Sequence, residues 1–416
     1  MSTSGRRGTD GPAPSAGDVA AGLREADFAR VLARADGDCL AAAGLLADAL
    51  AERGVPYQIR VGRFGETLAR PGEDGAGEQS DDPGGVTDPN ADAGDTTVGI
   101  GLDDAADVRL PGEATPASVT AFDAARELGA SPDPALALAG AVAAGRPAGA
   151  GGSAHVLEQA SESRIERRPG VGVPTDDLAD GLAHSTLAHA DYSGDREAAQ
   201  AALAELGLPA ELDDSAHRRV ASEYALAAAG AEDATDRAAE AVERALRPHA
   251  IAGDGSDDRG PDAPFATVEG YADVLDAVAR ERPGTGVALA LGHDARPDAL
   301  DAWRDHAARA HRVLREGTTG RYDGLFALRT EEAPVETVAR LLRNFRSPEP
   351  VALVVSDREA AAAAIEDANA AVGAAMTEAA RAVGGTGGGT STRGYARFDP
   401  ETDATEFLTA FREARP

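Results

Sequence analysis

Two aspartates separated by one glycine, Asp36 and Asp38, stand directly before an alanine-rich helical pattern in ARADGDCLAAAGLLADALAERGVP, residues 33–56. The preceding residues, FARVLAR, predict a strand, and carboxylates at the carboxyl end of a parallel strand lie where doubly wound sheets bind substrates. Such oxygen ligands suit Mg²⁺ or Mn²⁺, and two of these ions about 3.5–4 Å apart are a common device for phosphoryl hydrolysis. The alternative is a plain Asp/Gly turn in which Asp38 caps the helix.

A second pair of aspartates, Asp103 and Asp104, ends another predicted strand in TTVGIGLDD. If both strands belong to one sheet, we expect all four carboxylates to be the metal ligands; the alternative for this pair is a polar strand end. The segment LAHSTLAHADYSGD adds further candidates, which are His184, His189, Asp191 and Asp195. Its two histidines are five residues apart and do not share a helical face, which favours packing for the first and a helix C-terminus for the second over a zinc pair.

A glycine-rich run, GGTGGGTSTRG, occupies residues 384–394. Five glycines in six residues cannot form a helix, and they allow a backbone with exposed N–H groups to approach a ligand closely. The hydroxyls and the arginine that follow suit a phosphate backbone, while the absence of lysine excludes a Walker A loop. We therefore predict nucleic-acid-binding residues here, with a flexible connector as the alternative: Gly384, Gly385, Gly387, Gly388, Gly389, Thr390 and Arg393.

The elements around these residues predict an α/β protein of two domains. FARVLAR, the helix after Asp38 and the alternating strand VPYQIRVG form strand–turn–helix–strand, the start of a doubly wound parallel sheet. Helices are predicted for SVTAFDAARELG, for PALALAGAVAAG and through residues 175–248. The predicted limits are a disordered tail over 1–17, a first domain over 18–250 with a disordered acidic insert over 71–96, a linker over 251–264 and a smaller α/β domain over 265–416.

The predicted second domain also alternates strands with helices. Its strands are GVALALGH, GLFALRT, PVALVVSD and YARF, and the glycine-rich run is a loop before the last of them. Its helices are DALDAWRDHAARAHRVLREG, VETVARLLRNF, the long REAAAAAIEDANAAVGAAMTEAARAV and one at the C-terminus.

The composition limits the environment more than the function. The net charge is −31, and all 40 basic residues are arginine, which is typical of a GC-rich, salt-in halophile. At molar salt the Debye length is about 3 Å, so a few local arginines can still bind an anion. The single Cys39 excludes a disulfide framework and a multi-cysteine zinc site. No apolar run indicates a membrane span or a signal peptide, so we expect a cytoplasmic protein.

The order and local pattern of these segments resemble the DHH phosphoesterase superfamily, specifically its archaeal RecJ-like proteins, over nearly the full chain. The first strand, the DxD-like turn and the alanine-rich helix look like the first metal motif of that family, and GGTGGGTSTRG looks like the substrate loop of its DHH-associated domain. RRPGVGVPTDDLADGLAHST and LLRNFRSPEPVALVVSD look like the halophilic archaeal branch. The resemblance implies a nucleic-acid cleft between the domains and, in active members, Mn²⁺- or Mg²⁺-dependent cleavage of single-stranded DNA, RNA or small nucleotides.

Several positions depart from the family pattern. No His-His dipeptide exists, so the Asp-His-His signature is missing; Leu32 or Arg34 stands where the first motif has a histidine, and Thr390 where the C-terminal loop has one. An arginine beside a metal weakens metal binding by like-charge repulsion.

We therefore expect a catalytically degenerate protein of DNA replication or repair that binds single-stranded DNA or RNA. Its resemblance to the helicase-associated member of the eukaryotic replisome implies GINS and MCM as partners. The alternative is an active Mn²⁺- or Mg²⁺-dependent single-strand exonuclease or nucleotide phosphoesterase.

Overall fold

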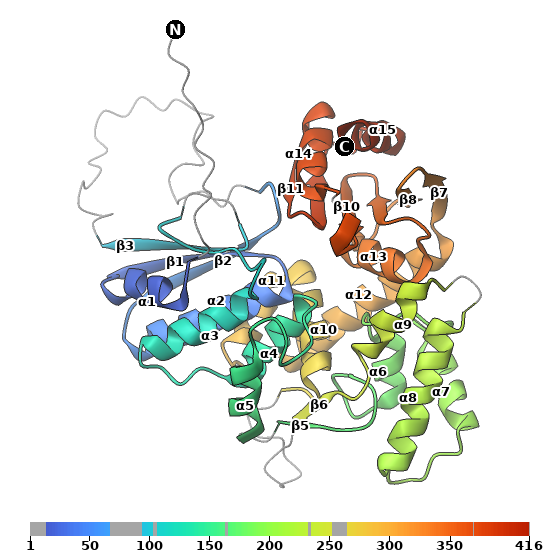
Figure 1. The fold of residues 1–416 in the computed structure, drawn as a ribbon, viewed down its shortest axis with the longest axis horizontal. Coiled ribbons are helices and arrows are strands. Elements are labelled where there is room, and N and C mark those ends of the chain that lie inside the picture. The colour runs from blue at the N-terminus through green and yellow to red at the C-terminus, as the bar shows by residue number, and fades with distance from the viewer. Residues whose placement is uncertain are drawn as a thin grey trace.

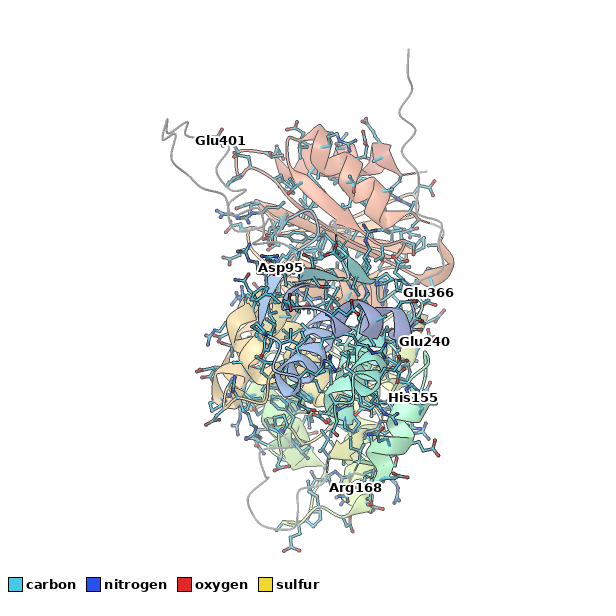
Figure 2. All side chains as sticks on the ribbon, turned by 90° about the vertical axis from the view of Figure 1, so that its left-hand side faces the viewer. Asp95, His155, Arg168, Glu240, Glu366 and Glu401 are labelled. Carbon is cyan, nitrogen blue, oxygen red and sulfur yellow. The ribbon has the colours of Figure 1, made fainter. Side chains whose placement is uncertain are left out.

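A computed structural model describes residues 14–66, 94–102, 106–162, 165–231, 234–251, 264–368 and 370–415. Along the chain it contains first a parallel sheet with its helices, then a group of helices, α6 to α9, and finally a mixed sheet (Figure 1). The two-domain α/β architecture predicted from the sequence is thereby confirmed. Acidic side chains such as Glu240, Glu366 and Glu401 lie on the outside of the molecule (Figure 2).

The N-terminal sheet is parallel throughout and has the strand order β2-β1-β3-β4. Its central strand is the apolar run predicted as FARVLAR, which pairs on both sides, as buried parallel strands do. The strands are β1 (Phe28–Arg34), β2 (Tyr57–Gly62), β3 (Asp95–Ile100) and β4 (Val108–Leu110). The helices of this region are α1 (Ala16–Arg24), α2 (Gly37–Glu52), α3 (Ala117–Glu127), α4 (Pro134–Ala143) and α5 (Ala154–Glu162).

Three later helices complete the first hydrophobic core: α10 (Val268–Glu281), α11 (Pro283–Ala290) and α12 (Arg296–Glu316). Residues from Phe265 to Trp303 pack in that core, so the cores do not divide at the predicted linker. The prediction of a strand for GVALALGH is wrong, because these residues form most of α11. Proline at its first turn starts the helix, and a short apolar run does not by itself distinguish helix from strand.

A helical unit lies between the two sheets in sequence. A two-stranded antiparallel ribbon closes it, formed by β5 (Ile165–Arg167) and β6 (His249–Ile251). Its helices are α6 (Leu178–His184), α7 (Arg196–Glu205), α8 (Asp214–Ala229) and α9 (Asp236–Glu243), which confirms the helices predicted through this part of the chain.

The C-terminal sheet has the order β11-β12-β10-β9-β8-β7. Its strands are β7 (Thr318–Tyr322), β8 (Leu325–Arg329), β9 (Val351–Val355), β10 (Glu359–Ala364), β11 (Thr386–Gly389) and β12 (Arg393–Arg397). Only β8 and β9 pair in parallel. The associated helices are α13 (Val335–Leu341), the π-helix η1 (Leu342–Arg346), the 3₁₀-helix η2 (Glu366–Ala368), α14 (Val372–Ala382) and α15 (Ala404–Ala414).

Two predictions for this sheet are wrong. The long alanine-rich segment is not one helix, because its first part is β10 and only its last part is α14. Alternate alanines of β10 join two different core clusters, and the pairing with β9 and β12 outweighs the helix propensity of alanine. The glycine-rich run is not a loop throughout, since residues 386–389 form β11 in a hairpin with β12.

Parts of several predictions lie outside the described residues. These parts are residues 1–13 of the tail, 71–93 of the acidic insert, 252–263 of the linker, and Asp103 with Asp104. None of the helices in the described ranges is both long enough and apolar enough to span a membrane.

Candidate functional site

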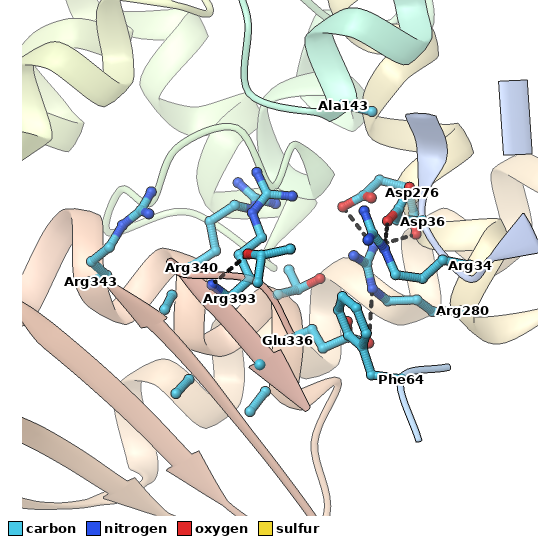
Figure 3. Close-up of a pocket in the computed structure, with 16 residues that line it drawn as sticks. Arg34, Asp36, Phe64, Ala143, Asp276, Arg280, Glu336, Arg340, Arg343 and Arg393 are labelled. Carbon is cyan, nitrogen blue, oxygen red and sulfur yellow. Dashed lines mark hydrogen bonds and ion pairs between the residues drawn. The ribbon is translucent and has the colours of Figure 1, made fainter. Parts of the chain in front are cut away.

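One pocket lies where the carboxyl end of β1 meets α10, α13 and the sheet strands β10 and β12 (Figure 3). It is lined by residues from both domains, and half of them are charged. The charged residues are Arg34, Asp36, Asp276, Arg280, Glu336, Arg340, Arg343 and Arg393. In Figure 3 these side chains form two groups, with carboxylates and paired arginines on one side and three further arginines on the other.

Arg34 forms an ion pair with Asp36, one of the carboxylates predicted as metal ligands. Its Nε donates to Asp36 Oδ2, its Nη1 donates to the carbonyl of Gly101 at 2.9 Å, and its guanidinium lies over the Phe64 ring at 4.7 Å. The other oxygen of Asp36 accepts from the N–H of Cys39 at 2.9 Å, which caps the start of α2. Although burial would raise the pKa of Asp36, the positive charge of Arg34 holds it below the usual value.

A second arginine, Arg280, pairs with the other two carboxylates on this side of the pocket. Arg280 Nη1 is 2.7 Å from Asp276 Oδ2, and its Nε is 3.2 Å from Glu336 Oε2. Asp276 Oδ1 also accepts from the N–H of Gly37 at 3.1 Å, which joins α10 to the start of α2. Burial opposes ionisation of Asp276, but the charges of Arg280 and Arg340 lower its pKa to about 2. This side of the pocket therefore holds carboxylates that are already paired with arginines.

Asp38 points away from the pocket. Its Oδ2 accepts from the N–H of Ala117 at 2.8 Å and its Oδ1 from the N–H of Ser118 at 2.9 Å. It thus caps α3, whose own N-cap residue, Pro116, makes no side-chain cap. Burial and the charge of Asp36 raise the pKa of Asp38 to about 6. Spacing predicted that both aspartates share one site, but the start of α2 directs them to different partners.

These donors do not fit a two-metal centre. Across the part of the chain that the structure describes, no cluster of three or more His, Cys, Asp or Glu side chains is arranged to hold a metal. Of the two predicted aspartates that the structure describes, only Asp36 reaches the pocket; a guanidinium bonds it, and the charge of that guanidinium opposes a divalent cation. Asp103 and Asp104 remain predicted ligands, because they lie outside the described residues.

The histidine segment has structural contacts. His184 Nδ1 lies 3.1 Å from Asp180 Oδ1, and the ring meets Trp303 edge-on at 5.7 Å, so the expected packing role fits its surroundings. His189 is not at a helix end; its Nδ1 is 3.0 Å from Nδ1 of His311. Burial lowers the pKa of His189 to about 4, so this pair is neutral at pH 7. Asp195 caps the start of α7, and the structure shows no ligand role for Asp191.

The other side of the pocket holds three arginines without carboxylate partners. Arg340 donates to the carbonyl and the hydroxyl of Thr186, both at 2.9 Å. Arg343 Nη1 donates to the Ala364 carbonyl and Arg393 Nη2 to the Ala144 carbonyl, each at 3.0 Å. Within the described ranges, no carboxylate lies within 4.0 Å of these guanidiniums.

Burial and repulsion between these cations lower the pKa of Arg343 to about 9. Burial also lowers the pKa of Arg340, although Asp276 and Asp273 oppose the effect. Three positive charges that face one pocket, with no described carboxylate in direct ion-pair contact, are an arrangement suited to binding an anion.

Four of the seven residues predicted to bind nucleic acid lie at the pocket or at a contact with the turn after β2, whereas Gly385 and Gly389 lie against residues of β12 and its end, and Gly384 has no neighbour within 4 Å of a Cβ. Of the predicted set, Thr390 and Arg393 line the pocket. Gly387 and Gly388 instead meet the turn after β2: a Cβ on Gly65 would lie 2.7 Å from the Gly387 nitrogen. Gly65 has a φ of +77°, so glycine is needed there for the backbone conformation as well as for the close approach.

Sequence reasoning missed the residues that α10, α13 and η1 bring to the pocket: Asp276, Arg280, Glu336, Arg340 and Arg343. One signal was available, because Arg340 and Arg343 are three residues apart in VETVARLLRNF and so lie on one helical face. No local pattern linked them to Asp36, which is about three hundred residues earlier.

Comparison with known proteins gives the family. Residues 317–413 match the model of the C-terminal domain of "Uncharacterized protein rrnAC1427". The curated protein of that description from Haloarcula marismortui is 50% identical over 420 residues, which cover all of both chains.

Two crystal structures share the fold. One is CDC45 from Entamoeba histolytica, with a TM-score of 0.57, 10% identity and coverage of 96% of this chain and 98% of that one. The other is RecJ with Mn²⁺ from Thermus thermophilus, with a TM-score of 0.50, 14% identity and coverage of 97% of this chain and 55% of that one. The chain therefore belongs to the family of the Haloarcula protein rrnAC1427, and its fold is that of the RecJ-like DHH superfamily.

Proposed function

We propose that this protein binds the phosphate backbone of single-stranded DNA or RNA in the interdomain pocket and does not hydrolyse it. The observation that carries this proposal is the division of the pocket. Its carboxylates are neutralised by Arg34 and Arg280, whereas Arg340, Arg343 and Arg393 have no carboxylate partner in the described part of the chain. An anion brought to the second group would neutralise charges that the protein itself leaves unpaired.

Phosphate is the anion that suits these side chains. A guanidinium offers planar, paired N–H donors that match two phosphate oxygens, and the charge-assisted bonds are about twice as strong as neutral ones. Thr390 contributes a hydroxyl at the same wall of the pocket. The net charge of −31 opposes the binding of an anion to the chain in general, which makes a cluster of arginines the place where one can bind. The half-buried setting of these arginines also reduces screening by the salt expected in a halophile.

Hydrolysis is not part of the proposal because the carboxylates are occupied. Two-metal catalysis needs carboxylates free to bridge and hold both ions. Arg34 binds Asp36 instead, and Arg280 binds Asp276 and Glu336. The alternative of an active Mn²⁺- or Mg²⁺-dependent exonuclease or phosphoesterase would require Asp36 to exchange a buried guanidinium for a metal.

A role in the replisome, in the cytoplasm and with GINS or MCM as partners, extends the proposal. Its support is the coverage: the likeness to CDC45 spans 96% of this chain and 98% of that one, whereas the likeness to RecJ covers 55% of that chain. Immobilised GINS and MCM from the same host, each tested for retention of the purified protein in molar KCl, would examine it. Absence of retention by both would remove this extension and leave the nucleic-acid proposal intact.

The pocket is tested with a fluorescent oligothymidylate and anisotropy in EDTA. We expect Arg393→Ala to weaken binding by about ten-fold or more, since one charge-assisted contact to a buried site contributes about 1.5–3 kcal/mol. The matched control is Arg381→Ala, which removes an exposed arginine that pairs with Glu378 on α14. Equal affinity of the Arg393 variant and the wild type would contradict the proposal.

A further inference from the structure

The interdomain pocket is too small for the ligand that its arginines suit. Its free volume is about 40 Å³, and one ordered water molecule needs about 10–15 Å³ of such space. In this structure the pocket therefore has room for a few water molecules but not for a phosphate that carries a sugar on either side. Arg393 is also engaged, because its Nη2 donates across the pocket to the Ala144 carbonyl at 3.0 Å. A strand must displace contacts that the protein makes with itself.

The turn that follows β2 joins the two domains beside this pocket. Arg63 Nη1 donates to both carboxylate oxygens of Glu359 on β10 at 3.3 Å, and the guanidinium lies over the Tyr395 ring at 5.0 Å. The hydroxyl of Tyr395 donates to the same carboxylate at 2.8 Å. Arg397, at the end of β12, lies 3.7 Å from Glu66. We call this contact of five side chains the latch.

Phe64, the residue after Arg63 in this turn, is a wall of the pocket. Its ring packs against the Arg34 guanidinium at 4.7 Å, and its Cβ lies 3.5 Å from the position of a Cβ on Gly388 in β11. Figure 3 shows Phe64 on the side of the pocket that holds the paired carboxylates. Movement of the turn away from the C-terminal sheet would therefore carry one wall of the pocket with it.

The latch is a contact of moderate strength. The side chains of Arg63 and Glu359 are each 23% exposed. An ion pair in such a partly exposed position changes an equilibrium constant by roughly three- to ten-fold. The latch can therefore hold the domains together for most of the time and still be broken when a ligand binds.

We infer that this structure is a closed state, in which the latch keeps the ligand out and must open before the pocket binds a strand. The inference rests on the proposed function and adds its regulation. A ligand that binds only the open state has an apparent Kd equal to its intrinsic Kd divided by the open fraction, so a weaker latch raises the affinity. Electrostatics alone predicts the opposite, because removal of an arginine near an anion site weakens binding.

Arg63→Ala separates these two expectations, because Arg63 belongs to the latch and is not among the residues that line the pocket. We expect the variant to bind a fluorescent oligothymidylate, in EDTA and molar KCl, roughly three- to ten-fold more tightly than the wild type. The matched control is Arg381→Ala, which removes an exposed ion pair within the C-terminal domain and should bind like the wild type. An Arg63 variant with equal or lower affinity would overturn the inference.

A disulfide tests the closed state even if Arg63→Ala does not fold. Phe64→Cys combined with Gly388→Cys places two Cβ atoms 3.5 Å apart, within the range of about 3.5–4.5 Å found in disulfides, and the native Cys39 is buried. We expect this pair to cross-link on oxidation without ligand. The oxidised protein should bind the oligothymidylate at least about ten-fold more weakly than the same protein after reduction, whereas the Phe64→Cys single variant should not respond to the oxidant.

Cross-linked protein that binds as tightly as reduced protein, or a cysteine pair that does not cross-link, would overturn the inference. Failure of the proposed function gives a different result, in which neither the wild type nor the reduced double variant binds the strand. Cross-linking needs no ligand and still reports on the latch in that case. Adding Arg63→Ala to the cysteine pair should slow disulfide formation roughly three- to ten-fold, and an unchanged rate would show that Arg63 does not hold the domains closed.

Discussion

Replacing Arg34 by methionine, which keeps much of its volume, should destabilise the protein and make its stability depend on pH in a new way. The side chains of Arg34 and Asp36 are 13% and 7% exposed, so the pair is buried. Removing one partner of a buried pair costs about 3–5 kcal/mol, because the other charge is left without compensation. The variant also loses the bond to the Gly101 carbonyl and the contact with Phe64.

The pH dependence has a definite direction. In the wild type the pKa of Asp36 is lowered, so its contribution to stability is present above the usual pKa near 3.8 and is lost as pH falls through the lower folded value. Without Arg34, the largest remaining cause is burial, which raises the pKa of Asp36, so we expect the folded pKa of the variant to be higher than in the wild type. The deficit of Arg34→Met should therefore be small near pH 4 and largest near pH 7.

Urea unfolding at fixed molar KCl, followed by circular dichroism at both pH values, measures this deficit. The matched variant is Arg34→Met combined with Asp36→Asn, because asparagine removes the charge and can still cap α2 through Cys39. We expect the double variant to be more stable than Arg34→Met alone at pH 7, with a coupling of about 1–3 kcal/mol. Additive effects and a deficit that does not change with pH would refute the claim that Arg34 neutralises Asp36.

Three further predictions concern other parts of the structure. Asp38 has a raised pKa of about 6, so wild-type stability should decline as pH rises from about 4 through 6, and Asp38→Asn should flatten that decline in urea unfolding while costing about 1–3 kcal/mol. Gly65→Ala should destabilise more than Gly54→Ala, because both positions have positive φ but only the first meets backbone atoms; equal losses in thermal unfolding would argue against the close domain contact. Thr186→Val removes the hydroxyl that accepts a hydrogen bond from Arg340. It should raise the Kd for a dinucleotide and for an oligonucleotide several-fold and by the same factor. An unchanged Kd would mean that binding does not depend on the position that Thr186 gives to Arg340.

Local pattern predicted the elements with unambiguous periodicity. The alternation in VPYQIRVG gave β2, and the apolar run FARVLAR gave β1. The alanines of β10 predict a helix because alanine is the strongest helix former. They form a strand because β9 and β12 pair with it on either side and core residues pack on both of its faces. The glycines of residues 386–389 predict a loop by their composition, yet they form strand β11, where neighbouring atoms leave no room for a Cβ at several of them.

The pocket could be predicted only in part. Spacing identified Asp36, the charge after the glycine-rich run identified Arg393, and comparison with the family pattern identified Arg34. Local sequence offered no link between these residues and Asp276 or Arg340, because α10 and α13 reach the pocket only after the whole chain has folded. The sequence also could not show that Asp36 lines the pocket while Asp38 caps α3, because this difference depends on partners that only the folded chain supplies.

The central claim is that this pocket binds a nucleic-acid strand through arginines and without a divalent metal. The most direct measurement is the affinity for a labelled single strand in Mn²⁺ and in EDTA at molar KCl, with strand integrity checked on a gel afterwards. The account predicts the same affinity in both, loss of affinity in Arg393→Ala, and an intact strand. Binding that requires Mn²⁺, or cleavage in Mn²⁺ that disappears in Asp36→Ala, would contradict it.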